Sequence, residues 1–348
     1  MEITRKKNKF TGYLMSQDKI IGEISNNEVV SIDNELAPLY IKNTGDFEGW
    51  LKFRSIDLHR TNSRLLRKVL RLNTNDEVNI VLSVHGLAIT DTYWVKEKSS
   101  NLTYRDVRFT TDKFSDLALF GDPNAFSFEA SLTPEMTNIG SYEKCWKVRN
   151  GNWYMYKQGS VNERFSEIFA FKLGKKLGFN MAEYKLIDKY IVSEDFTDNA
   201  SVNFEPMYSL VLEDEDYKVN IEALTKIDAA LVKQYMDIIF LDTIVMNVDR
   251  HTFNYGLIRD VNSGKILSMA PNFDNNLSLI SRGYAKNTDR NDLLVKLFKE
   301  VLEENKYKIP VLSKELIRDT AEAAAREFED EFDIDYIVDF CMNAYYKL

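Results

Sequence analysis

The chain has 348 residues, of which 44% are hydrophobic and 12% aromatic, so it is long and apolar enough to form two or three packed units and is not a disordered protein. Its 45 Lys and Arg against 54 Asp and Glu give a net charge of −9, which argues against a large nucleic-acid-binding surface. Two cysteines and three histidines exclude a disulfide framework and an ordinary structural zinc site.

No secretory or membrane segment is expected. The start, "MEITRKKNKF", has no apolar run after its basic residues, and no window reaches 18 consecutive apolar residues. We therefore expect a cytoplasmic protein.

Residues 1–125 are predicted to form an N-terminal subdomain of mixed strands and helices. "NSRLLRKVLRL" (62–72) has the apolar spacing of a helix, whereas "VNIVLSV" (78–84) favours a strand. The Gly, Pro, Ser and Thr residues of 121–141 are typical of a boundary loop.

Residues 126–197 are expected to be rich in strands and to contain one long helix. Asn150-Gly151 is a strong signal for a two-residue hairpin turn. In the helix predicted over 161–179, an apolar stripe runs along one face and Gly178 is placed to end the helix. Residues 184–196 return to a strand pattern.

Residues 198–348 are predicted to be mainly helical. A long buried helix spans 227–247, amphipathic helices follow at 292–304, 313–332 and 337–348, and a hairpin turns around 262–264. The acidic tract 327–335 is interpreted as a solvated helix face with the cap that follows it.

Three oxygen-bearing side chains in this last region have the spacing of a phosphoryl-transfer site. Asp249 and Asn254 are five residues apart, and Asp274 follows across the predicted hairpin. Protein kinases place a catalytic base and a metal-binding Asn five residues apart on one loop, and the second metal ligand on a later segment. The pattern predicts Asp249 as the base and Asn254 and Asp274 as ligands of Mg²⁺.

The remaining parts of a nucleotide site occur upstream in the expected order. Lys157 ends a predicted strand, and Glu163 and Glu167 lie one turn apart on the next helix. Glu167 lies beside the apolar stripe and is the better partner for the lysine. "TNIGSYEK", with Gly140 and Ser141, occupies the position of a phosphate-covering loop but has one Gly only.

As a set, these motifs resemble those of the HipA-like serine/threonine kinase family, which is related to the phosphatidylinositol kinases. The segments that carry the resemblance are "SLTPEMTNIGSYEK", "YMYK", "SEIFAFKLGKKLG", "VSEDF", "NVDRHTFN" and "PNFDNN". The resemblance covers about residues 125–348. It implies an α+β, protein-kinase-like bilobal fold: a strand-rich small lobe (126–197) and a helical large lobe (198–348), preceded by the extra mixed subdomain (1–125).

The resemblance also implies roles for further residues. Glu194, Asp195 and Phe196 correspond to the hinge that touches adenine, and His251 to the histidine of the catalytic loop, where Arg250 and His251 are expected to brace the loop. A regulatory Ser of the HipA toxin corresponds to Thr137, which raises the hypothesis of autophosphorylation there.

The implied activity is transfer of the γ-phosphoryl group of ATP, with Mg²⁺, to a Ser or Thr hydroxyl of a protein. The protein substrate is not identified by the sequence. The resemblance further raises the hypotheses that the chain is the toxin of a toxin–antitoxin pair and binds a helix-turn-helix antitoxin. Direct contact with nucleic acid or with a membrane is not expected.

Two alternatives remain open at this stage. One is a nucleotide-binding pseudokinase or partner-binding module, and the other is a phosphatidylinositol-type lipid kinase, which "DRHTFN" resembles in its Asp-Arg-His order. Taken singly, each site residue also has a structural interpretation. Asp249 could belong to a salt-bridged helix end, Asp274 to a turn, Lys157 to a solvated strand end, Glu167 to a helix surface and Thr137 to a plain loop.

Overall fold

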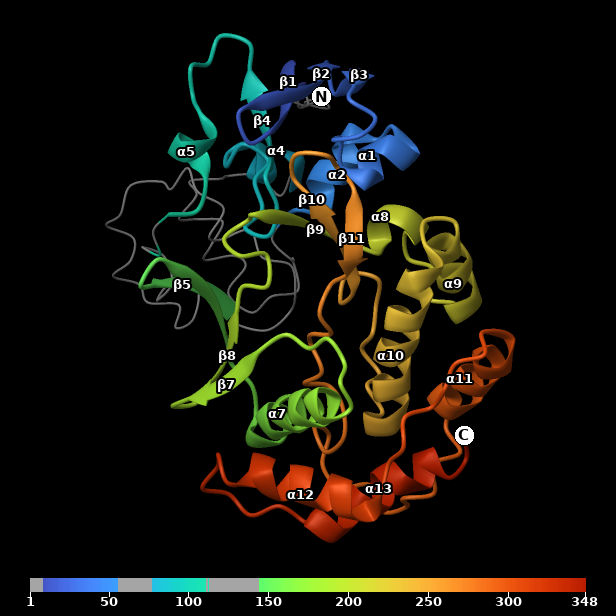
Figure 1. Cartoon of the computed structure of the whole chain (residues 1–348). Coiled ribbons are helices and arrows are strands. Elements are labelled where there is room, and N and C mark those ends of the chain that lie inside the picture. Colours follow the sequence, from blue (N-terminus) through green and yellow to red (C-terminus); the bar gives the residue numbers. More distant parts are fainter. Residues whose placement is uncertain (1–8, 56–76, 111, 113–143) are drawn as a thin grey trace, which may run out of the picture. The chain divides into compact units, whose positions relative to one another are not determined.

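The computed structural model describes residues 9–55, 77–110, 112 and 144–348, which divide into two compact units (Figure 1). The first unit comprises residues up to 157 together with 197–205 and 258–267. The second unit comprises 158–196, 206–257 and 268–348. Each unit is assembled from separate stretches of the chain.

An antiparallel sheet of order β3-β2-β1-β4 organises the first unit. Its strands are β1 (Gly12–Ser16), β2 (Lys19–Ser25), β3 (Glu28–Ile32) and β4 (Tyr93–Glu97). Four short helices accompany it: α1 (Leu39–Thr44), α2 (Phe47–Lys52), α4 (Glu77–Leu82) and α5 (Tyr104–Val107). Leu14, Ile24, Trp50 and Trp94 are among the side chains of its core.

Two further hairpins confirm sequence predictions. The strands β5 (Lys144–Arg149) and β6 (Asn152–Lys157) join at Asn150 and Gly151, whose φ angles of 54° and 86° suit a tight two-residue turn. The strands β10 (Gly256–Asp260) and β11 (Ile266–Met269) form the hairpin predicted around 262–264, and β9 (Val202–Pro206) extends their sheet in the order β11-β10-β9.

The second unit is mainly helical. Its strands are β7 (Tyr184–Ile187) and β8 (Tyr190–Glu194), and its helices are α7 (Val161–Lys176), α8 (Tyr208–Val211), α9 (Tyr217–Thr225), α10 (Ala229–Val245), α11 (Leu293–Glu304), α12 (Lys314–Ala325) and α13 (Ile334–Tyr345). Helix α7 packs on α12, and α10 packs on α9, α11 and α13.

Local sequence explains where α7 and α10 begin and end. Ser160 and Glu163 form a capping box at the start of α7, and Gly178, at φ 78°, follows its end. Asp228 caps α10, and the residues of its second half, 238–245, are buried on all sides. Met246 ends α10 in the left-handed conformation, at φ 56°, where a glycine is the usual residue.

Two predicted elements were wrong. Residues 78–82 lie in helix α4 and not in a strand. Helix α12 ends at Ala325, so the acidic tract 327–335 lies mostly in the connection to α13, which Asp333 caps. The strand pattern of 184–196 is confirmed, and it forms the hairpin of β7 and β8, in which Asp188 reverses the chain at φ 51°. The helix predicted at 62–72 and the boundary loop at 121–141 lie outside the described residues.

A buried ionic centre lies in the first unit around Arg259 of β10. Its guanidinium pairs with Glu205 of β9 and donates to the Tyr93 hydroxyl at 3.1 Å and to the Glu35 carbonyl at 2.6 Å. Burial raises the pKa of Glu205, and Arg259 opposes that rise. Gly264 of the hairpin approaches the same segment so closely that an added Cβ would meet the Glu35 oxygen at 1.9 Å.

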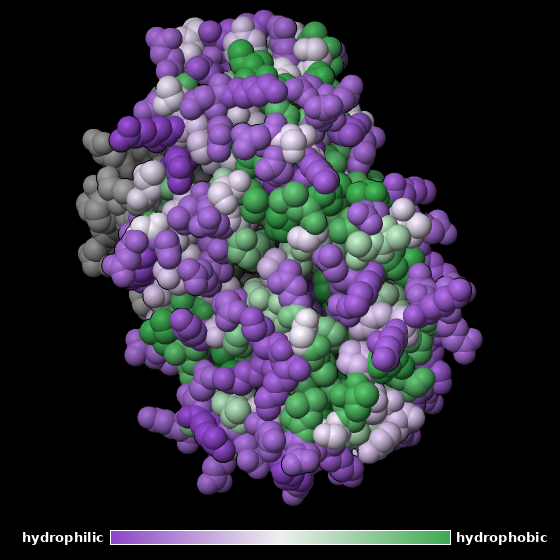
Figure 2. Space-filling model, viewed as in Figure 1, coloured by the Kyte–Doolittle hydropathy of each residue, from purple (hydrophilic) through white to green (hydrophobic). Residues whose placement is uncertain are grey.

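Among the described residues, no helix is long and apolar enough to span a membrane. The face drawn in Figure 2 carries hydrophilic and hydrophobic residues in alternating groups. The predicted boundaries of the three domains, at residues 125 and 197, stay predictions.

Candidate active site

The predicted catalytic loop, "NVDRHTFN" (247–254), begins just after the buried helix α10 ends. The Asn247 backbone N–H donates to the Asp242 carbonyl at 2.9 Å, which turns the chain out of the helix. The Asp249 N–H donates to the Asn247 side-chain oxygen at 3.2 Å, and this bond holds the backbone of the predicted base. Asp249 itself is half-buried.

Arg250 is the centre of a buried hydrogen-bond network in the second unit. Its guanidinium binds both carboxylate oxygens of Asp242, each at 2.9 Å, and donates to the Asn254 carbonyl at 2.7 Å and to the Phe273 carbonyl at 2.6 Å. It also reaches the side-chain oxygen of Asn275 at 2.8 Å. One side chain thus joins α10, the catalytic loop and the segment 271–276, "PNFDNN", called here the metal segment.

Charge explains why this arginine tolerates burial. Burial alone would lower the pKa of Arg250, but the carboxylates of Asp242, Asp274 and Glu167 together raise the pKa above its ordinary value. A buried arginine of this kind stays charged, and its fork of donors fits planar acceptors on several sides. These contacts agree with the prediction that Arg250 braces the loop.

The geometry of Asn254 suits a metal ligand. Its amide nitrogen donates to the Asp249 carbonyl at 2.9 Å, a bond that closes the five-residue loop. Because the amide nitrogen makes that bond, the amide oxygen is the atom left for a cation such as Mg²⁺. Asn254 is buried, so its orientation is fixed by the surrounding loop.

Asp274 adopts a backbone conformation that is uncommon for a residue with a side chain. Its φ is 60°, in the left-handed region. The Tyr184 hydroxyl accepts from the Asp274 N–H at 3.1 Å, and the Asn247 amide donates to the Asp274 carbonyl at 3.3 Å. Both backbone groups of the predicted metal ligand are therefore held by side chains.

Glu167 is fully buried on α7, which makes its interpretation as a surface helix residue wrong. Its Oε1 accepts from the Asn275 N–H at 2.8 Å, immediately after Asp274. The structure thus brings the predicted helix glutamate and the metal segment together.

The predicted hinge and the catalytic-loop histidine also lie in the second unit. Glu194 is exposed at the end of β8, whereas Asp195 is buried. The ring of Phe196 packs on Phe273, with the ring centroids 5.5 Å apart, beside Asp274. The His251 Nδ1 accepts from the Phe253 N–H at 3.3 Å, a contact that braces the loop from within.

Other predicted site residues are not brought together by the described contacts. Lys157 ends β6 in the first unit, so its pairing with Glu167 stays a prediction. Gly140, Ser141 and Thr137 lie outside the described residues. The roles of all predicted site residues remain predictions.

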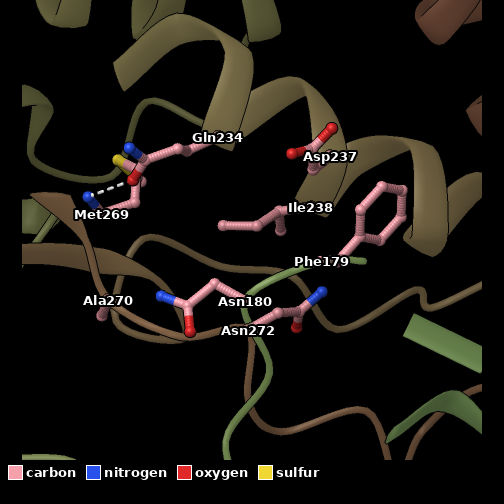
Figure 3. Close-up of a pocket in the computed structure, with 8 residues that line it drawn as sticks. All are labelled: Phe179, Asn180, Gln234, Asp237, Ile238, Met269, Ala270 and Asn272. Carbon is pink, nitrogen blue, oxygen red and sulfur yellow. Dashed lines mark hydrogen bonds between the residues drawn. The ribbon is translucent and has the colours of Figure 1, made fainter. Parts of the chain in front are cut away.

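A small cavity borders this network without containing the predicted site (Figure 3). It measures about 30 Å³, room for about two water molecules, and is lined by Phe179, Asn180, Gln234, Asp237, Ile238, Met269, Ala270 and Asn272. The Asn272 side-chain oxygen accepts from Arg250 at 2.9 Å, so the amide nitrogen of Asn272 points away from the guanidinium. This cavity is too small to hold a nucleotide.

Within the described residues, no group of three or more His, Cys, Asp or Glu side chains forms a ready metal site. The predicted ligands, one carboxylate and one amide oxygen, would need phosphate oxygens and water to complete the coordination of Mg²⁺. Such a shared shell is usual for this ion at nucleotide sites.

Comparison with known proteins agrees with the predicted fold. No known protein-family profile matches the sequence, and no matching protein was found among curated ones. The solved structure of HipA from Shewanella oneidensis MR-1, in complex with HipB and operator DNA, matches with a TM-score of 0.60 and 12% identity, over 97% of this chain and 96% of that chain. The Helicobacter pylori proinflammatory kinase CtkA matches with a TM-score of 0.42 and 18% identity, over 59% of this chain and 90% of that chain.

The chain therefore has an α+β, protein-kinase-like fold. Within that class its fold is the HipA-like one, with the additional N-terminal subdomain, and the predicted fold class is confirmed. The likeness in structure extends over nearly the whole chain, whereas the resemblance in sequence covers only residues from about 125 onward.

Sequence reasoning missed four residues that hold the site together: Asp242, Asn247, Asn275 and Tyr184. Asp242 carried a signal, since a carboxylate inside an otherwise apolar helix needs a buried partner. Tyr184 carried none, because its contact with Asp274 spans 90 positions of the chain.

Proposed function

We propose that the protein is an ATP-dependent serine/threonine kinase of the HipA type, acting on a protein hydroxyl in the cytoplasm. The observation that carries this proposal is the Arg250 guanidinium. It ties the loop that contains Asp249 and Asn254 to the segment that contains Asp274, within a HipA-like fold. A structural turn would not need to join these two segments through one buried cation.

Each residue has a defined task in the proposed reaction. Asp249 orients the acceptor hydroxyl and takes its proton as the oxygen–phosphorus bond forms and the bond from the γ-phosphorus to the bridging β–γ oxygen breaks. Asn254 and Asp274 hold Mg²⁺, which would neutralise charge on the phosphates when bound. Lys157, supported by Glu167, binds the α- and β-phosphates, and Gly140 and Ser141 cover them.

The adenine would contact the hinge of Glu194, Asp195 and Phe196. His251 supports the catalytic loop through its contact with Phe253. Positioning and electrostatic stabilisation supply most of the rate enhancement in such a site, because the transition state of phosphoryl transfer is loose and offers little covalent work to the protein.

The direct test is calorimetric titration of ATP into the protein with and without Mg²⁺, alongside Asp274→Asn. Saturable, Mg²⁺-dependent binding that the substitution weakens is the expected result. Binding without any dependence on Mg²⁺ would favour a pseudokinase, and no binding by the folded protein would overturn the proposal. Transfer of labelled phosphate to protein or to phosphatidylinositol vesicles then separates the protein kinase from the lipid kinase.

The acceptor and the partner are finer parts of the proposal. The HipA structure from Shewanella oneidensis contains HipB and operator DNA, which is consistent with a helix-turn-helix antitoxin as the partner here. Because the chain carries a net charge of −9, any contact with DNA should run through such a basic partner. Autophosphorylation of Thr137 is a further hypothesis, which Thr137→Ala and mass spectrometry after incubation with ATP would test.

A further inference from the structure

The connection between α7 and β7, residues 177–183, runs beside the metal segment. The Asn272 N–H donates to the Asn180 carbonyl at 2.8 Å, and the Ala182 N–H donates to the Asn272 carbonyl at 3.0 Å. Met181 and Asn272 form an isolated parallel bridge. These bonds fix the register of the two segments, and Tyr184, three residues after Met181, comes close to Asp274, two residues after Asn272.

At that position the Tyr184 hydroxyl accepts a hydrogen bond from the Asp274 backbone, at 3.1 Å. Asp274 has a φ of 60°, a conformation that costs free energy for any residue with a Cβ and persists only where the surroundings enforce it. On the other side of the residue, Asn247 holds the carbonyl. Tyr184 and Asn247 together constrain both ends of this unusual backbone.

We propose that Tyr184 is a positioning residue for the metal carboxylate. Its hydroxyl holds the Asp274 backbone in the left-handed conformation and thereby sets the direction of the side chain that binds Mg²⁺. This inference rests on the proposed function for its link to the metal, while the hydrogen bond itself can be tested without any nucleotide.

The surroundings explain why a tyrosine is needed and a phenylalanine would not serve. The Tyr184 ring packs edge-on to Phe171, with the centroids 6.1 Å apart, a contact that either residue could make. Without the hydroxyl, however, the Asp274 N–H would lose this acceptor in a buried site. Burial raises the pKa of Tyr184, and the carboxylates of Glu167 and Asp274 raise it further, so the hydroxyl stays neutral at physiological pH.

The test compares Tyr184→Phe with the wild type and with Tyr307→Phe. Tyr307 is a matched control because its hydroxyl also makes a partly buried hydrogen bond, but to Asp237 at 2.7 Å and not to Asp274. Hydrogen exchange of the peptide that contains Asp274 is measured without nucleotide. Calorimetry then measures the Mg²⁺ concentration needed for half-maximal binding of ATP.

In Tyr184→Phe we expect exchange at Asp274 to become faster and the required Mg²⁺ concentration to rise by about 5- to 10-fold, the equivalent of one lost hydrogen bond. Affinity for ATP without metal should not change. Tyr307→Phe should leave both readouts at the wild-type values.

The outcomes separate this inference from the proposed function. Wild-type exchange and wild-type Mg²⁺ dependence in Tyr184→Phe would overturn the inference, as would equal changes in Tyr307→Phe, since these would reflect general destabilisation. If the wild type binds no Mg-ATP at all, the proposed function fails, and the exchange measurement alone decides on Tyr184. Faster exchange confined to the Asp274 peptide would then support the positioning role, and unchanged exchange would refute it.

Discussion

Two buried arginines, nine positions apart in the chain, show how the same chemistry serves different ends. Arg250 in the second unit pairs with Asp242, and Arg259 in the first unit pairs with Glu205. Both guanidiniums also donate to backbone carbonyls and are almost inaccessible to solvent.

Their partners differ in kind. The acceptors of Arg250 belong to the catalytic loop, the metal segment and helix α10. Each of these elements carries or adjoins predicted site residues. The acceptors of Arg259 belong to the hairpin, to β4, to β9 and to the chain around Glu35, where no site residue is predicted. A buried ion pair is therefore not itself a sign of function, and the elements that it joins decide its meaning.

Replacing each arginine by methionine tests whether the two ion pairs differ in what they support. Removal of one partner from a buried pair leaves an uncompensated carboxylate and costs about 3–5 kcal/mol of stability. All four tryptophans lie in the first unit, at positions 50, 94, 146 and 153, so tryptophan fluorescence during urea unfolding reports on that unit. Arg259→Met should lower its unfolding free energy by that amount.

The two variants should differ in nucleotide binding. Folded Arg259→Met should retain Mg²⁺-dependent binding of ATP, and Arg250→Met should lose it together with the order of both site segments. Calorimetry at a temperature where circular dichroism shows both variants folded provides the measurement. Loss of binding in both variants would show that the first centre also supports the site.

A second prediction isolates chemistry from stability within the Arg250 region. Asp249→Asn preserves the shape of the side chain but removes the proton acceptor, so phosphate transfer should fall on the order of 10²-fold or more. The unfolding free energy should change by less than about 0.5 kcal/mol because Asp249 is only half-buried and Asn has the same shape. Turnover equal to that of the wild type would remove the assignment of Asp249 as the base.

The third prediction concerns Tyr93, the counterpart in the Arg259 centre of Tyr184 in the site. The Tyr93 hydroxyl donates to Glu205 at 2.9 Å and accepts from Arg259 at 3.1 Å. Tyr93→Phe should cost about 1.5–3 kcal/mol, the value of hydrogen bonds to charged groups. Its Mg²⁺ requirement should equal that of the wild type, and a raised requirement would contradict the division between the two centres.

The sequence marks candidate site residues more clearly than it marks the small elements around them. Asp249, Asn254 and Asp274 stand out as candidates because phosphoryl transfer constrains residue type and spacing along a continuous stretch, and their roles stay predictions. Helix α10 was recognisable from its long apolar run. By contrast, "VNIVLSV" is a short run rich in β-branched residues, and such runs do not distinguish a strand from a buried helix.

Contacts over long sequence distances account for most of what was not predicted. Strand β9 carries Glu205, whose partner Arg259 lies 54 positions away, and no local pattern marks either residue. The break at Asp188 could have been recognised, since Asp tolerates a left-handed turn conformation between two strands.

The smallest expected effect is a dependence of stability on pH that belongs to the first unit alone. Burial lowers the pKa of His85 below 6.5, with Glu97 opposing the shift, and the ring packs edge-on to Trp94. Because the folded pKa is the lower one, the unfolded chain binds more protons between the two values. The contribution of neutral, buried His85 to the free energy of unfolding is therefore fully present above pH 6.5. It is lost as the pH falls from 6.5 toward the lower pKa of the folded protein.

His85→Asn removes the titration and retains a side chain that tolerates the positive φ of 57° at this position. Tryptophan-monitored urea midpoints between about pH 5 and 7 should slope upward with pH in the wild type and less steeply in the variant. An identical slope in wild type and variant would assign the acid sensitivity to other groups and leave His85 as a packing residue only.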